Sequence, residues 1–139
     1  MAFESLIFLL VAFFIAFPFL FTMNRCLEQM APESRRISQS QLWLNLIPAF
    51  NLIWTFVSAR RFAQSMAAEK QRRRPTADVT HGDKGLITAA LFAGFMVTLP
   101  FSAWNWLLFA AWMLALALYW KDIALDILWL TQNRPPRET

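Results

Sequence analysis

Long hydrophobic blocks, hardly interrupted by charge, restrict the fold of this chain more than any other feature of its sequence. The first block, residues 5–23, contains no charged residue and as a helix would reach roughly 28 Å, close to the thickness of a bilayer's hydrocarbon core. Hydrophobic residues make up 58% of the 139 residues and charged residues only 16%. A soluble domain of this size could not bury so much apolar surface. We therefore expect an integral membrane protein.

Four such blocks predict an all-α membrane protein with four transmembrane helices, arranged as two helical hairpins in one membrane domain. Helices 2 and 4 are expected to extend into the cytoplasm, because helix-forming residues continue beyond their apolar parts. The single membrane domain covers residues 1–139, with TM1 at 5–23, TM2 at 42–59 and its cytoplasmic extension at 60–74, TM3 at 86–101, and TM4 at 103–120 with an extension to 131.

A capping box, Ser38-x-x-Gln41, predicts where the second helix begins. In such a box the serine side chain accepts a hydrogen bond from the backbone of the third helical residue, and the glutamine side chain accepts one in return. No stop signal follows before Pro75, so we expect one helix from about residue 39 to residue 74.

The distribution of positive charge predicts the orientation in the membrane. If all four blocks span, the N-terminus, loop 60–84 and the C-terminal tail share one side, which holds most of the 13 Lys+Arg. The positive-inside rule then places both termini in the cytoplasm. An alternative stays open: residues 42–59 could enter the membrane and return as a re-entrant segment. All 13 positive residues would then lie inside and the N-terminus outside.

A proline-centred motif lies within the second block, with an asparagine on each side of Pro48 and a tryptophan toward each end. It resembles the pattern W-x-x-L-I-P-x-F-N-x-x-W of a family of small bacterial polytopic inner-membrane proteins. The resemblance implies a location in the bacterial inner (cytoplasmic) membrane, and it implies no activity. The matching residues are Trp43, Leu46, Ile47, Pro48, Phe50, Asn51 and Trp54, followed by weaker matches at Ser65, Met66, Glu69 and Tyr119-Trp120-Lys121.

Asn45, Pro48, Asn51 and Trp54 are the candidate residues for helix packing or for a pathway through the membrane. Asn45 and Asn51 would not share a face of an ideal helix, but a kink at Pro48 could change that. Membrane asparagines commonly hydrogen-bond to neighbouring helices and stabilise their packing. A broken helix with exposed polar groups could instead bind an ion or a substrate group.

Two aspartates near the end of the last block, Asp122 and Asp126, share one helix face. We expect inter-helix ion pairs between these acids and Arg60 and Arg61 at the end of TM2. Cation binding or proton relay by the paired carboxylates is the alternative.

The run Arg72, Arg73 and Arg74 closes the basic extension over residues 60–74. It is expected to contact anionic lipid headgroups or a partner subunit, since each basic residue near an anionic membrane surface contributes about 1 kcal/mol.

Catalytic and metal-binding signatures are missing from the sequence. Cys26 is the only cysteine and His81 the only histidine, and there is no hydrolase, kinase, Rossmann or P-loop signature. The net charge of +4 lies in juxtamembrane segments, where it acts as a topology signal, so no nucleic-acid partner is expected. We expect no catalytic residue, metal or cofactor and no enzymatic activity, although an unfamiliar membrane chemistry stays open.

Small size, the absence of charge within the spans and a large aromatic surface favour an accessory or structural subunit of a larger bacterial inner-membrane complex. It would interact with membrane lipids and with other membrane protein subunits, or with itself as a homo-oligomer. The alternative function is a small oligomeric transporter or channel with a pathway near Asn45, Pro48 and Asn51. A helper that binds a pigment or a quinone is a third hypothesis, which depends on the aromatic residues alone.

Overall fold

The structure is a computed structural model that describes residues 2–76, 84–98 and 102–134. Every element in these ranges is helical, which confirms the all-α prediction. The elements are α1 (Ala2–Glu28), the 3-10 helix η1 (Pro32–Ser34), α2 (Gln39–Trp43), the 3-10 helix η2 (Leu44–Leu46), α3 (Pro48–Arg73), α4 (Lys84–Thr98) and α5 (Ser102–Gln132).

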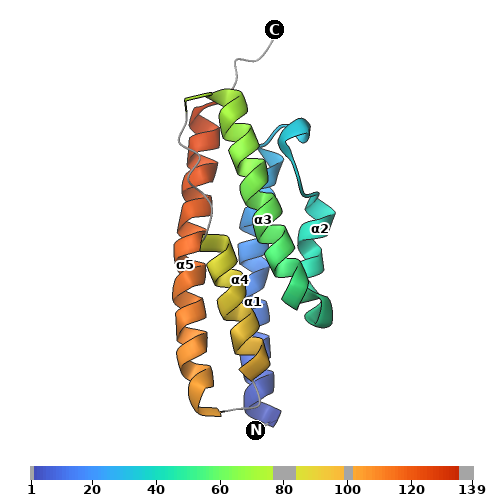
Figure 1. Cartoon of the computed structure of the whole chain (residues 1–139), viewed down its shortest axis with the longest axis vertical. Coiled ribbons are helices and arrows are strands. Elements are labelled where there is room, and N and C mark those ends of the chain that lie inside the picture. Colours follow the sequence, from blue (N-terminus) through green and yellow to red (C-terminus); the bar gives the residue numbers. More distant parts are fainter. Residues whose placement is uncertain (1, 77–83, 99–101, 135–139) are drawn as a thin grey trace.

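The first and last helices, α1 and α5, run parallel to each other along the length of an elongated bundle (Figure 1). The ring of Phe8 packs on Phe109 with centroids 5.4 Å apart, and further along both helices the Trp120 indole donates a hydrogen bond to the Thr22 hydroxyl at 3.0 Å. The shorter helix α4 runs antiparallel to α5 and fills one half of the bundle.

Only α1 and α5 are long and apolar enough to cross a membrane among the described helices. Their candidate spans are Leu6–Glu28 and Trp104–Gln132, whereas α4 is a shorter apolar helix. These two helices suggest a membrane location. Four transmembrane helices are not confirmed.

The predicted single helix over residues 39–74 is wrong, because the chain reverses direction at Ile47 and Pro48. The capping box of Ser38 and Gln41 is confirmed, and α2 begins at Gln39 as expected. The residue before a proline disfavours the helical backbone conformation, and Ile47 is extended, with φ −82° and ψ 112°. Pro48 then starts α3 at a position where its missing N–H costs nothing.

The resulting hairpin of α2, η2 and α3 folds back on itself within the bundle (Figure 1). Near its tip the Trp54 indole donates to the Gln41 carbonyl at 2.7 Å. Near its open end the Arg36 backbone N–H donates to the Ser65 hydroxyl at 2.7 Å. A backbone that turns back here is compatible with the re-entrant alternative raised by the sequence, which stays a prediction.

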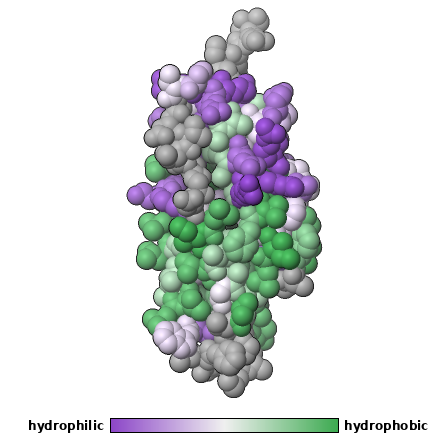
Figure 2. All heavy atoms as spheres, viewed as in Figure 1, coloured by the Kyte–Doolittle hydropathy of each residue, from purple (hydrophilic) through white to green (hydrophobic). Residues whose placement is uncertain are grey.

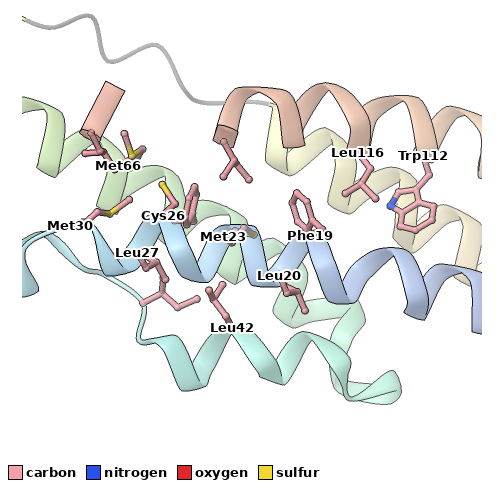
Figure 3. Close-up of a cluster of buried hydrophobic side chains, with 14 of the residues drawn as sticks. Phe19, Leu20, Met23, Cys26, Leu27, Met30, Leu42, Met66, Trp112 and Leu116 are labelled. Atoms are coloured by element: carbon pink, nitrogen blue, oxygen red, sulfur yellow. The ribbon is translucent and has the colours of Figure 1, made fainter. Parts of the chain in front are cut away.

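A continuous hydrophobic core joins the long helices to the hairpin. Leu20 and Leu27 of α1 lie beside Leu42 of α2, and Cys26 lies near Met66 of α3 (Figure 3). Phe19, Met23, Trp112 and Leu116 extend the same core along α1 and α5.

The bundle divides into a hydrophobic half around α4 and a hydrophilic half around the upper parts of α3 and α5 (Figures 1 and 2). Helix α1 begins at the hydrophobic end, and α5 ends at the hydrophilic end. The start of α1 and the end of α5 thus lie at opposite ends of the bundle, and the expectation that both termini are cytoplasmic stays a prediction.

Candidate functional site

A small cavity of about 70 Å³ lies within the bundle, beside the tip of the hairpin. Apolar residues from α1, α4 and α5 form most of its wall, among them Phe19, Phe92 and Trp112. Six uncharged polar side chains also line it: Asn45, Asn51, Thr55, Ser58, Thr88 and Tyr119. The break at Pro48 thus brings Asn45 and Asn51 to one cavity, as a kink there was predicted to allow.

The buried Asn45 carboxamide holds the hairpin together. Its nitrogen donates to the Leu42 carbonyl at 2.8 Å, and its oxygen accepts from the Ser58 hydroxyl at 3.1 Å. Both ends of the amide are therefore used within the protein. These two bonds support the packing role predicted for Asn45, which stays a prediction.

The half-buried Asn51 carboxamide is only partly engaged. Its oxygen accepts a hydrogen bond from the Thr55 hydroxyl. Within the described part of the chain, no hydrogen bond is made by its amide nitrogen. Asn51 therefore presents a hydrogen-bonding group to the cavity.

A second hollow, a groove of about 250 Å³, meets the cavity at its edge. Ala16, Asn45, Asn51 and Phe92 line both spaces. The remaining walls of the groove are apolar: Leu6, Leu9, Leu10, Ala12, Phe13, Leu46 and Met96. The cavity, with its few polar side chains, is thus continuous with an apolar groove along α1.

The hydrophilic half contains a buried cluster of charges centred on Glu69, whose side chain is 0% exposed. Arg73 and Arg72 donate to this carboxylate at 2.6 Å and 2.9 Å, and the Ala31 backbone N–H donates at 3.2 Å. Burial raises the pKa of Glu69, but the hydrogen bonds from Arg72, Ser34, Arg73 and Ala31 outweigh burial and lower the pKa to about 2.

Arg73 points inward and ties three helices together. It donates to the carbonyl oxygens of Gln29 after α1 and Leu130 in α5, at 2.6 Å and 2.7 Å. The prediction that Arg72, Arg73 and Arg74 act together as a lipid or partner contact is therefore wrong for Arg73. Arg72 and Arg74 remain exposed.

The predicted ion pairs form with other partners. Asp126 pairs with the buried Lys70 at 2.9 Å, and Asp122 pairs with Lys84 at 2.6 Å. Arg60 is exposed, and Arg61 lies over the Trp54 ring, with its guanidinium carbon 5.6 Å from the ring centroid.

Helical spacing explains why the two aspartates pair with lysines and not with the predicted arginines. The inward face of α3 carries Ala59, Phe62, Met66 and Lys70, which are buried. Arg60 and Arg61 fall off this face, whereas Lys70 falls on it, one turn beyond Met66. The same spacing could have indicated from the sequence that Glu69 and Arg73 are buried.

The loop containing His81 lies outside the described residues, and in the part of the chain that is described no group of acidic, histidine or cysteine residues could hold a metal ion. Comparison of the chain with protein-family models, curated proteins and solved structures found no match. The resemblance carried by the proline-centred motif therefore stays a prediction.

Proposed function

We propose that the protein is an accessory subunit of a bacterial inner-membrane complex, which binds other subunits through the outward faces of α1 and α5. The observation that carries this proposal is how little of these helices the chain itself covers. In the most apolar window of each, 28% of α1 and 17% of α5 is buried. Large apolar side chains such as Phe14 and Leu114 are exposed at 74% and 63% and are left for a partner to cover.

The hydrophilic half faces the cytoplasm in this proposal. Ala59, Gly85 and Tyr119 meet at one level of the bundle. Arg60 and Lys121 follow this level along α3 and α5, which run toward the hydrophilic end. The described residues toward the hydrophobic end, 2–23, 48–58, 86–98 and 102–118, contain no lysine or arginine. The positive-inside rule then puts the start of α1 outside the cytoplasm and the end of α5 inside.

The buried charges of the hydrophilic half support a docking role. Arg73 and Glu69 connect α1, α3 and α5, so the relative positions of the two outward faces are held by charge-assisted hydrogen bonds. A rigid surface loses less conformational entropy when a partner binds.

Site-specific photo-crosslinking in native membranes tests the proposal. A photoreactive residue at Phe14 or Leu114 is expected to capture a discrete protein partner, and the same residue at the buried Met23 serves as the matched control. If both outward positions capture only lipid, and gently extracted protein is a monomer, the proposal is wrong.

A second function, a small oligomeric transporter or channel, is favoured by one observation. The hairpin of α2, η2 and α3 brings Asn45 and Asn51 to one cavity within the bundle, as in the broken helices of transporters. Substituting both asparagines with leucine is expected to abolish any flux measured with the purified protein in liposomes. An unchanged flux would remove this candidate.

A further inference from the structure

We propose that the cavity and the groove together form a binding site for an uncharged lipid of the diacylglycerol type. The hydroxyl and ester groups of the lipid would lie at the polar side chains of the cavity, and one acyl chain would follow the groove along α1. This inference goes beyond the proposed accessory function and does not depend on it.

The lining of the site disfavours a charged ligand. Neither the cavity nor the groove is lined by a charged side chain in the described part of the chain. A charged head placed at this depth would need a counter-charge, since an ionised group within a bilayer costs about 2.5–3.5 kcal/mol or more. Phospholipid headgroups therefore do not fit the cavity, whereas a hydroxyl or an ester does.

The hydrogen-bonding groups of the cavity can bind both the hydroxyl oxygen and the ester carbonyl oxygens of a diacylglycerol. The amide nitrogen of Asn51, which is not engaged by the described residues, can donate to an ester carbonyl. The hydroxyl of Thr88 donates to the Lys84 carbonyl at 2.8 Å, so its oxygen keeps lone pairs to accept from a lipid hydroxyl. Ser58 donates to Asn45 and is left with the same accepting capacity.

The volumes of the cavity and the groove distinguish between candidate ligands. A cavity of about 150 Å³ is known to bind a benzene ring. The cavity of about 70 Å³ is about half that size, so it favours a hydroxymethyl or ester group over a quinone ring. The groove of about 250 Å³ gives room for a hydrocarbon chain.

The direction of the groove also fits a lipid tail. On α1 the cavity is lined from Ala16 to Met23, and the groove from Leu6 to Ala16. At a rise of 1.5 Å per residue, the groove continues roughly 15 Å from the cavity toward the hydrophobic end. Head and tail would therefore lie one after the other along the same helix.

Photolabelling of the purified chain tests the inference. The probe is a 1,2-diacylglycerol with a diazirine in one acyl chain, presented in phosphatidylcholine nanodiscs. We expect labels on peptides that contain Leu9, Leu10 or Phe13, and competition by unlabelled diacylglycerol but not by phosphatidylglycerol or a quinone.

Two variants locate the site. Ala16→Leu fills the junction of cavity and groove, and Ala90→Leu makes the same change on an exposed face of α4 as the matched control. Asn51→Leu removes the side-chain amide N–H group that would donate to the ester carbonyl of the lipid. We expect Ala16→Leu and Asn51→Leu each to reduce labelling roughly fivefold, the order expected for the loss of one good hydrogen bond or its equivalent in packing, and Ala90→Leu to leave it unchanged.

Equal labelling of Ala16→Leu and Ala90→Leu would overturn the inference, and so would equal competition by phosphatidylglycerol, because both results describe a general lipid annulus. If Ala16→Leu does not elute as a folded, monodisperse protein, Asn51→Leu and the competition series decide the question.

Discussion

Arg73→Ala is expected to be among the most destabilising single substitutions in the hydrophilic half. The Arg73 side chain is 7% exposed and pairs with the 0% exposed Glu69 at 2.6 Å. It also donates to the carbonyls of Gln29, Leu130 and Asn133 at 2.6 Å, 2.7 Å and 3.2 Å. The substitution leaves three carbonyls without this donor and Glu69 without its closest partner.

The expected loss of stability depends on which hydrogen bonds to Glu69 remain in the Arg73→Ala variant. Breaking a buried ion pair by removing one partner costs about 3–5 kcal/mol. Glu69 keeps the hydrogen bonds from Arg72 and the Ala31 backbone, so its charge is not left alone. We therefore expect a loss near the lower end, about 3 kcal/mol of unfolding free energy.

Unfolding of the purified protein in mixed micelles, followed by tryptophan fluorescence, measures this loss. Arg74→Ala is the matched control, because Arg74 is exposed and its removal is expected to change stability by less than about 0.5 kcal/mol. Arg73→Lys keeps the positive charge but loses the planar guanidinium group with its several N–H donors. Its stability should lie between those of Arg73→Ala and Arg74→Ala. If Arg73→Ala is as stable as Arg74→Ala, the interpretation of this cluster is wrong.

Three further predictions concern the same fold. Glu69 has a folded pKa of about 2, below its ordinary value, so its stabilising contribution is present above about pH 4.5 and is lost as pH falls toward 2. The melting temperature of Glu69→Gln should therefore vary less with pH over that window than the melting temperature of wild type. Parallel curves of melting temperature against pH would refute this. A Cβ at Gly85 would lie 2.9 Å from the Tyr119 ring, so Gly85→Ala should cost about 1–3 kcal/mol. A Cβ at Gly94 would meet no atom of the described residues within 4 Å, so Gly94→Ala should be neutral or stabilising in the same denaturation assay. Trp54→Phe removes the indole bond to Gln41 near the hairpin tip and should cost about 1 kcal/mol; no change would show that this bond does not stabilise the hairpin.

Local signals in the sequence were sufficient to predict much of the helical structure. The capping box of Ser38 and Gln41 correctly predicted the start of α2, and the apolar blocks at 86–101 and 103–131 correspond closely to α4 and α5. These features depend on residues a few positions apart. No distant contact is needed to specify them.

The reversal at Pro48 could not be decided in the same way. A proline is compatible both with a kinked membrane helix and with the first residue of a new one. The choice depends on contacts between distant residues, such as Asn45 with Ser58 and Ala31 with Glu69. The correct partners of Asp122 and Asp126 depend on the same reversal, since it sets the register of α3 against α5.

The measurement that tests the central claim most directly is labelling of single cysteines in intact cells with a membrane-impermeant maleimide, in a Cys26→Ala background. Cysteines would be placed at Phe3, Glu33 and Arg74, all of which are exposed. A re-entrant hairpin predicts labelling of Phe3→Cys from outside, and labelling of Glu33→Cys and Arg74→Cys only after the membrane is permeabilised. Labelling of Glu33→Cys from outside with Phe3→Cys protected would instead establish four spans and contradict the account.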